Sequence, residues 1–242
     1  MAGLRVVRDG VILRVTLAKP ERRNAFDAKL IRELTDAFGD VGDARVVVLA
    51  GEGPSFCAGA DVEWQRASID LSYDENVEDA MRLYRMLELV DSCPAPVLAR
   101  VQGYALGGGS GLVCCTDVAI AADDAVFGFS EVKLGIIPAV ISPFVFRRIG
   151  TAAARRYFLT GERFDAKTAL RIGLVQQVGG DLDAVVEELL SSGPEATRAA
   201  KQLIRDRPEP DELAQIAARL RTSPEGQEGL RAFLDKRKPD WT

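Results

Sequence analysis

Histidine is absent from the 242 residues of the chain. This absence excludes every mechanism that needs an imidazole: Ser-His-Asp and Cys-His nucleophiles, a histidine general base, and a zinc ion held by histidine. Chemistry in this protein must therefore use carboxylates, lysine, tyrosine, cysteine or backbone groups. No metal site is predicted, because no carboxylate cluster at ligand spacing stands out either.

Cysteine is scarce, and the four cysteines form no Cys-x-x-Cys pair. A chain of this length needs no disulfide framework, so Cys57, Cys93, Cys114 and Cys115 are predicted to be reduced thiols. Cys57 and the pair Cys114 and Cys115 are expected to be buried as small apolar side chains. No uncharged apolar run is long enough for a signal sequence or a membrane span. The sequence therefore predicts a cytoplasmic protein with no membrane partner.

A basic excess is also missing. Lys and Arg total 31 against 36 Asp and Glu, which gives a net charge of −5. Such a balance argues against nucleic acid or an anionic membrane as a partner. With 47% hydrophobic and 28% charged residues, the composition is that of a globular protein with one domain, or one domain plus a helical appendage.

Strand and helix patterns alternate along the chain, which predicts a layered α/β fold. We expect a hairpin at the start, a mobile polar loop at residues 67–75, and a region after residue 183 of about three helices that pack on something other than the sheet. The predicted strands are residues 4–7, 11–17, 45–50, 97–101, 117–122, 125–129 and 173–178. The predicted helices are residues 27–38, a segment ending near 90, a short one ending near 115, 138–160 and 165–172.

Two loops rich in small residues follow predicted strands and lead into helices. They are residues 56–61 (FCAGAD) and residues 103–111 (GYALGGGSG). Amide N–H groups near a helix start lack partners within the helix and can point at an anion, and small side chains keep them accessible. The alternative is tight packing of helix on strand. Neither loop matches a phosphate-loop or G-x-G-x-x-G nucleotide signature.

Six segments in the same order and spacing resemble the enoyl-CoA hydratase/isomerase (crotonase) family. They are residues 24–25 (NA), 56–61, 103–109, 131–138 (EVKLGIIP), 159–161 (LTG) and 233–239 (FLDKRKP). The resemblance implies a crotonase-type ββα spiral core at residues 1–185 and a C-terminal helical trimerisation region at residues 186–242. Residues 130–135 and 138–143 look most like bacterial methylglutaconyl-CoA and isohexenylglutaconyl-CoA hydratases.

The resemblance implies an acyl-CoA thioester as substrate, with CoA carried by the substrate and no other cofactor. Backbone N–H groups of Ala58 and Gly108 would form an oxyanion hole that stabilises an enolate-like state. Residues expected to contact CoA are Arg23, Asn24, Ala25, Ala58, Gly59, Ala60 and Asp61. The implied assembly is a homotrimer or a dimer of trimers, in which Phe233 and Lys236 would reach CoA on a neighbouring subunit.

Glu131 matches one of the two glutamates that hydratases of this family use, and it is predicted to be the acid/base residue. Gly111 stands at the position of the other glutamate. Either Gly111 serves helix packing, or its missing side chain leaves room for charge and bulk on a substrate that brings its own carboxylate. Tyr104, beside the second loop, is predicted to be a core or lining aromatic.

Several functions remain open on these residues. The first is reversible hydration of an α,β-unsaturated acyl-CoA, with 3-methylglutaconyl-CoA as a candidate substrate. A site with one glutamate also resembles the Δ3,Δ2-enoyl-CoA isomerases, because moving a double bond requires one base that shuttles one proton. Decarboxylation of an acyl-CoA and binding of acyl-CoA without turnover are the other two.

Overall fold

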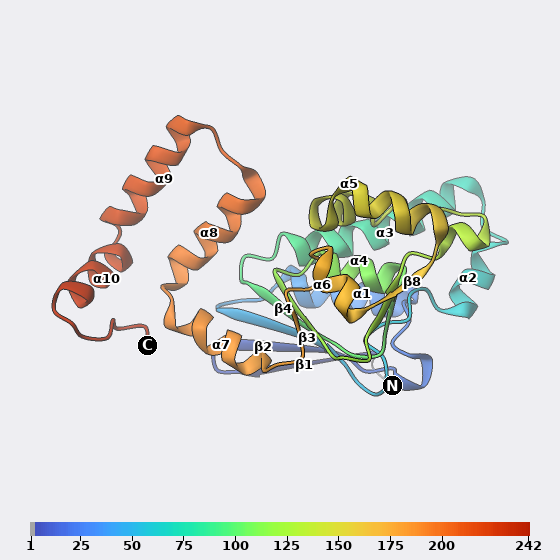
Figure 1. The fold of residues 1–242 in the computed structure, drawn as a ribbon, viewed down its shortest axis with the longest axis horizontal. Coiled ribbons are helices and arrows are strands. Elements are labelled where there is room, and N and C mark those ends of the chain that lie inside the picture. The colour runs from blue at the N-terminus through green and yellow to red at the C-terminus, as the bar shows by residue number, and fades with distance from the viewer. Residues whose placement is uncertain (1–2) are drawn as a thin grey trace.

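A six-stranded sheet forms one layer of the computed structural model, which describes residues 3–242 (Figure 1). Residues 1 and 2 of the predicted core lie outside the described residues. The strand order is β1-β2-β3-β4-β6-β9, with β1 antiparallel to β2 and the other pairs parallel. The strands are β1 (Leu4–Asp9), β2 (Ile12–Leu17), β3 (Val46–Gly51), β4 (Val97–Val101), β6 (Val118–Ala121) and β9 (Gln177–Val178). The predicted hairpin is confirmed.

Both faces of the sheet are covered, as the apolar runs of its central strands require. Successive residues of β3 alternate between two cores: Val47 and Leu49 face the main core, whereas Val46 and Val48 face a smaller one. The smaller core is closed by Leu182 and Val186 of α7 (Leu182–Ser191). This helix therefore packs on the sheet, contrary to the prediction for the helices after residue 183, and the expected boundary at 185/186 falls inside it.

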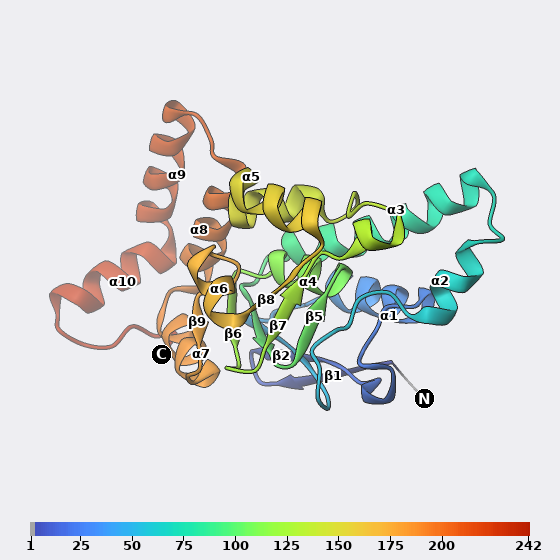
Figure 2. The ribbon, with the colours of Figure 1, turned by 45° about the vertical axis from the view of Figure 1, so that its right-hand side comes forward.

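A second, three-stranded sheet stands beside the first (Figure 2). Its strands are β5 (Tyr104–Leu106), β7 (Val126–Gly128) and β8 (Arg163–Asp165). β5 lies within the segment predicted as a loop, and β8 was not predicted at all. Both are three residues long and are defined by hydrogen bonds to β7, a distant partner that no local pattern reveals.

The helices of the core are short except for two. They are α1 (Ala28–Gly39), α2 (Val62–Ser68), α3 (Tyr73–Asp91), α4 (Gly108–Cys114), α5 (Ser142–Thr160) and α6 (Ala166–Arg171), with 3₁₀ turns η1 (Pro20–Arg22) and η2 (Glu131–Leu134). The loop predicted at residues 67–75 is shorter than expected and is confined to residues 69–72. α2 ends at Ser68, and Ser72 with Glu75 forms a capping box that starts α3.

α5 begins four residues later than predicted, and Gly150 interrupts it with a φ of 71°. The alternation of strands and helices nevertheless confirms the predicted α/β fold class. Within residues 3–242, no helix combines the length and the apolar character needed to cross a bilayer.

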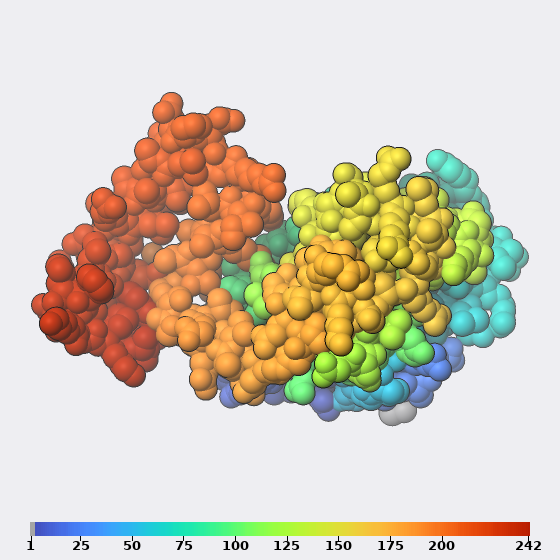
Figure 3. All heavy atoms as spheres, in the orientation of Figure 1, coloured from blue at the N-terminus to red at the C-terminus, as the bar shows by residue number. Residues whose placement is uncertain are grey.

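Three helices continue beyond α7: α8 (Pro194–Asp206), α9 (Pro210–Thr222) and α10 (Pro224–Leu234). α9 and α10 stand away from the sheets (Figures 1 and 3). The tail after α10 folds back, and the Arg45 guanidinium donates hydrogen bonds to the backbone carbonyls of Leu190, Ser192 and Trp241 at 2.7, 2.7 and 2.9 Å. The start of β3 is thereby joined to both ends of the helical region.

Candidate active site

A cavity of about 360 Å³ lies where the two loops of small residues meet the end of β7. Five of the residues predicted for the site line it: Ala58, Gly59, Ala60, Gly108 and Glu131. The remaining lining is mostly apolar: Phe26, Trp64, Leu83, Leu106, Leu134, Ile136, Ile137, Pro138, Val140 and Ile141, with Gln65, Gly107, Ser130 and Arg163 as the others. The cavity thus presents an apolar wall and few polar groups, as expected of a site for a small molecule.

Backbone pairing holds the two loops together. Cys57 N donates to Tyr104 O and Leu106 N donates to Cys57 O, both at 3.0 Å. A Cβ built on Gly109 would overlap the Cys57 carbonyl, so this glycine permits the close approach. The packing interpretation of the glycine-rich loop therefore holds for Gly109, and it places the start of α4 beside residues 57–60.

The N–H of Ala58 is already engaged: it donates to the carbonyl of Arg23 at 3.0 Å. Arg23 and Asn24 both have left-handed backbone conformations, with φ of 51° and 55°. The buried amide of Asn24 fixes this turn by accepting from Lys19 N and donating to the carbonyls of Glu52 and Ser55. The prediction that Ala58 supplies an oxyanion donor is therefore wrong, because its N–H is used to join the two segments.

Ala60 offers the amide that Ala58 does not. Phe26 and Ala60 form a parallel bridge, in which Phe26 N donates to Gly59 O at 2.7 Å and Asp61 N donates to Phe26 O at 2.8 Å. In such a bridge the residues on either side make the hydrogen bonds, so the N–H of Ala60 points the other way. It has no acceptor within residues 3–242, and Ala60 lines the cavity. Whether the N–H of Ala58 or that of Ala60 is available depends on pairing with residues near Phe26, which are distant in the chain and which the sequence does not identify as partners.

Gly108 supplies the second available amide. Gly107 turns the chain with a φ of 52°, and Gly108 is the first residue of α4. The first helical hydrogen bond runs from Gly111 N to Gly107 O at 3.0 Å, so the Gly108 N–H has no partner inside the helix. Gly108 also lines the cavity.

Glu131 begins η2 and turns its carboxyl group toward the Gly107 turn, where a Cβ on Gly107 would lie 3.0 Å from Oε1. Its Oε2 is buried and makes no hydrogen bond within the described chain. Burial raises the pKa of Glu131 above its ordinary value of 4.5, because the charged form loses hydration, and a hydrogen bond from its own backbone N–H offsets this loss only in part. A carboxyl group shifted in this direction holds a proton more readily than an ordinary glutamate, which suits a group that accepts a proton and returns it.

Gly111 does not line the cavity; it is fully buried inside α4. A Cβ built on it would lie 2.8 Å from Ile141 Cβ and closer still to Cγ2. The space beside Gly111 is therefore filled by Ile141, and the predicted room for charge or bulk of a substrate is not there. The packing interpretation of Gly111 agrees with this contact.

Tyr104 lies outside the cavity lining and carries two guanidinium groups over its ring, those of Arg23 and Arg163, at 5.6 and 5.5 Å from the centroid. Arg163 is the single basic residue among the cavity lining residues. The three cysteines predicted to be buried are buried, as is the fourth, and burial raises the pKa of Cys57 and of Cys114 to about 12. A thiolate nucleophile is thereby disfavoured at these two positions.

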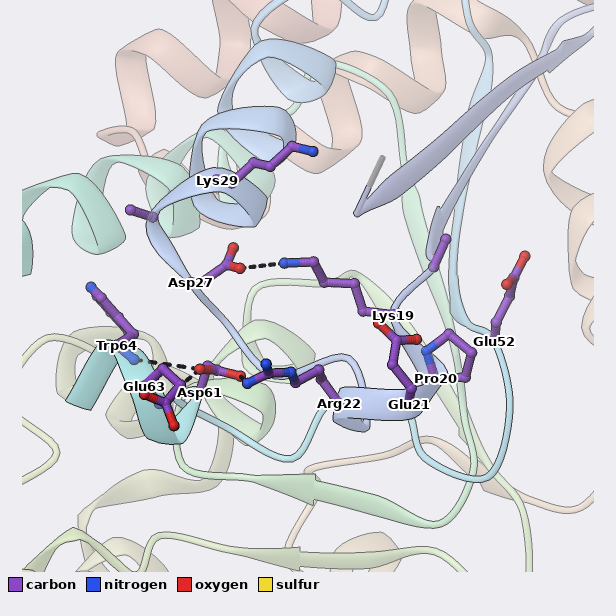
Figure 4. Close-up of a pocket in the computed structure, with 12 residues that line it drawn as sticks. Lys19, Pro20, Glu21, Arg22, Asp27, Lys29, Glu52, Asp61, Glu63 and Trp64 are labelled. Atoms are coloured by element: carbon purple, nitrogen blue, oxygen red, sulfur yellow. Dashed lines mark hydrogen bonds and ion pairs between the residues drawn. The ribbon is translucent and has the colours of Figure 1, made fainter. Parts of the chain in front are cut away.

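A larger cavity of about 840 Å³ is lined by η1 and by the starts of α1 and α2 (Figure 4). Asp61 there accepts from Glu63 N at 2.8 Å and pairs with Arg22 at 3.2 Å, so its side chain caps α2. The lining holds three basic residues, Lys19, Arg22 and Lys29, against five acidic ones, Glu21, Asp27, Glu52, Asp61 and Glu63. This balance does not favour the phosphates of CoA.

The remaining predicted residues are not among those that line the cavity containing Glu131. Arg23 and Ala25 are in the turn after η1, and Ala25 is buried. Phe233 is 80% exposed at the end of α10, and Lys236 follows it with a φ of 55°. Neither Phe233 nor Lys236 is among the lining residues of the cavity in this chain.

The sequence profile of the enoyl-CoA hydratase/isomerase family matches residues 8–242. The chain belongs to this family. A crystal structure of an enoyl-CoA hydratase from Shewanella pealeana is 40% identical, covers 99% of this chain and 96% of its own, and superposes with a TM-score of 0.92. AtuE of Pseudomonas aeruginosa is 38% identical, covers 99% of both chains, and gives a TM-score of 0.94.

An enoyl-CoA hydratase of Alternaria alternata, ACTT6, is 32% identical over 84% of this chain and 70% of its own. These matches extend over both sheets and the C-terminal helices, so this enoyl-CoA hydratase/isomerase family protein has the crotonase fold. The predicted family and fold are confirmed.

Proposed function

We propose that the protein catalyses the reversible hydration of an α,β-unsaturated acyl-CoA. The observation that carries this proposal is the buried Oε2 of Glu131, which has no hydrogen-bond partner within residues 3–242, in a cavity lined also by Ala60 and Gly108, whose N–H groups have no acceptor among the same residues. An acyl-CoA whose thioester oxygen accepts from both amides places its Cα and Cβ beside the carboxyl group. The CoA portion arrives with the substrate, and no further cofactor takes part.

Glu131 moves the proton in both halves of the reaction. Its carboxylate takes a proton from water while the hydroxide adds to Cβ, and the negative charge passes to the thioester oxygen as an enolate. The two amides stabilise that charge more strongly than the neutral carbonyl, which is the condition for catalysis. The protonated Glu131 then delivers the proton to Cα, so that water has been added across the double bond.

Isomerisation is the second candidate, because Glu131 is the sole carboxylate among the lining residues of the cavity. In that reaction Glu131 removes a proton from C2 of a 3-enoyl-CoA and returns it to C4. The dienolate between these steps has the same oxyanion and uses the same two amides. One base is sufficient for such a shuttle.

An assay panel separates these functions. Purified protein is incubated with crotonyl-CoA, a 3-enoyl-CoA and 3-methylglutaconyl-CoA, and the products are identified by mass spectrometry and chromatography. We expect the 3-hydroxyacyl-CoA as the main product, with 3-methylglutaconyl-CoA as the candidate physiological substrate. A 2-enoyl-CoA from the 3-enoyl substrate supports the isomerase instead. Release of CO₂ indicates a decarboxylase, and binding without turnover contradicts both catalytic proposals.

The assembly we propose is a homotrimer or a dimer of trimers in the cytoplasm. Exposed apolar side chains lie along the outer helices, among them Leu203, Ile204, Leu213, Leu230 and Phe233, and a soluble monomer rarely leaves such a surface uncovered. Phe233 and Lys236 would then contact CoA bound to a neighbouring subunit. Light scattering of the purified protein tests the assembly, and a monomer at micromolar concentration contradicts it.

A further inference from the structure

The contact between Gly111 and Ile141 fixes one wall of the catalytic cavity. The two residues come from different elements: Gly111 is in α4 and Ile141 is the residue that precedes α5. Ile141 is 2% exposed, and its side chain fills the volume that any side chain at position 111 would need. It also lines the cavity that contains Glu131, whereas Gly111 does not.

We propose that Ile141 is a specificity-determining residue of this enzyme. Its side chain occupies the space that a residue larger than glycine would need at position 111. It also makes that wall of the cavity apolar. Glu131 thereby stays the one ionisable acid that a bound acyl chain meets. The proposal accounts for the glycine at position 111, because Ile141 fills the space that a side chain there would occupy.

The position of Ile141 is firmly held. Its carbonyl accepts from Val145 N at 3.1 Å at the start of α5, and its Cβ branch restricts the side-chain rotamers. A side chain at position 111 cannot displace it cheaply, because α4 is buried from Gly109 to Cys114 and has no free space on this face. Steric exclusion between the two positions is therefore expected to be measurable as an energetic coupling.

The chemical consequence rests on the proposed function. The acyl group that faces Ile141 must be uncharged and apolar there, since a carboxylate against this wall would lose its hydration without gaining a partner. The fitting substrate class is an enoyl-CoA with a hydrocarbon substituent, such as a methyl branch, at that point of the chain. The free carboxylate of a substrate such as 3-methylglutaconyl-CoA would have to lie elsewhere in the cavity.

A double-mutant cycle tests the packing. Thermal unfolding is measured for the parent protein, Gly111→Ala, Ile141→Ala and the double variant. Alanine normally stabilises a helix relative to glycine, so a lower melting temperature for Gly111→Ala is itself diagnostic. We expect the melting temperature of the double variant to be higher than the value obtained by adding the two single-variant changes. Additive effects, or a stabilised Gly111→Ala, overturn the proposal.

The matched control for the first substitution is Gly39→Ala, at the exposed end of α1, where nothing lies within 4 Å of a new Cβ. Its melting temperature should stay equal or rise. Ile149→Ala, on α5 but outside the cavity lining, controls for loss of a buried isoleucine.

Steady-state kinetics test the specificity. Ile141→Val and Ile141→Ala are assayed with crotonyl-CoA and with a bulkier, branched 2-enoyl-CoA. We expect the ratio of kcat/KM for the bulkier substrate over crotonyl-CoA to rise about tenfold in Ile141→Ala and less in Ile141→Val. An unchanged ratio overturns the specificity role.

The unfolding cycle needs no activity. If it shows coupling while no acyl-CoA is turned over by the parent protein, the proposed function fails and the steric exclusion at Gly111 stands. The specificity role of Ile141 then fails together with the function.

Discussion

Burial of Glu131 lowers the stability of the folded protein but favours the proton transfer that we propose for this residue. One of its carboxyl oxygens is buried without a partner in the described chain, which destabilises the charged form in the folded protein, yet the same burial raises the pKa and so favours uptake of a proton. Replacing Glu131 by Gln keeps the shape and removes the proton transfer. We expect kcat to fall by at least about 100-fold with acyl-CoA affinity retained, as measured by steady-state kinetics and calorimetry. Unchanged turnover contradicts the assignment.

The raised pKa of Glu131 also predicts how the Gln variant changes stability with pH. The folded protein holds the Glu131 proton above the ordinary pKa of 4.5, whereas the unfolded chain releases it there. The free energy of unfolding therefore falls as the pH rises from that value through the folded pKa. We expect Glu131→Gln to be more thermostable than the parent at pH 8, with a smaller advantage at pH 4. An equal difference at both values contradicts the raised pKa.

The Gly108 amide can be removed without breaking a helical hydrogen bond. Proline is tolerated at the first position of a helix, so Gly108→Pro deletes the N–H at a position that suits it. Gly108→Ala is the matched control, because both variants add a Cβ that would lie 3.1 Å from the Phe26 ring. We expect kcat of the proline variant to be about 10²–10³-fold below that of the alanine variant. Equal rates would remove this amide from the mechanism.

At the scale of elements, α2 depends on a single cap. Asp61 accepts from the backbone N–H groups of Glu63 and Trp64, and Trp64 lines the cavity that contains Glu131. Asp61→Ala removes about 1 kcal/mol of cap stabilisation, so we expect α2 to loosen and KM for acyl-CoA to rise more than kcat falls.

Two further variants separate the roles of this side chain. Asp61→Asn keeps a good capping residue and should restore most of the affinity, whereas Arg22→Gln removes the ion pair and leaves the cap. Tryptophan fluorescence reports the state of α2 in each. If Asp61→Asn is as impaired as Asp61→Ala, the ion pair and not the cap is responsible.

Elements with a local signal were predictable from the sequence. The helix predicted at residues 27–38 corresponds to α1, and the Asp27 side chain caps it by accepting from Leu30 N at 2.7 Å. The apolar runs of β3 and β4 likewise predicted buried strands. The short strands β5 and β8 were missed, because their pairing depends on β7. The same limit applied to the site: the cavity at Glu131 followed from motif order, but the choice of Ala60 over Ala58 depends on the Phe26 bridge and the Arg23 carbonyl.

At the scale of the whole molecule, Arg45 joins the sheet to the helical region through three backbone carbonyls. Arg45→Gln shortens the side chain and removes these donors. We expect faster hydrogen exchange in residues 235–242 and around Ser192, with little change in the central strands. Arg32→Gln, an exposed arginine of α1, is the control. Exchange that stays slow in the tail of Arg45→Gln contradicts the role of this side chain.

The contacts of Arg45 also imply an order in which segments fold during synthesis. Arg45 leaves the ribosome long before Trp241 has been translated, and the helix and strands that surround it can fold first. Until the later segment arrives, a positively charged group at the rim of the nascent sheet has none of its final acceptors. The helical region therefore closes onto a core that is already formed, so mistakes in that last step would change the placement of this region and leave the cavity that contains Glu131 intact.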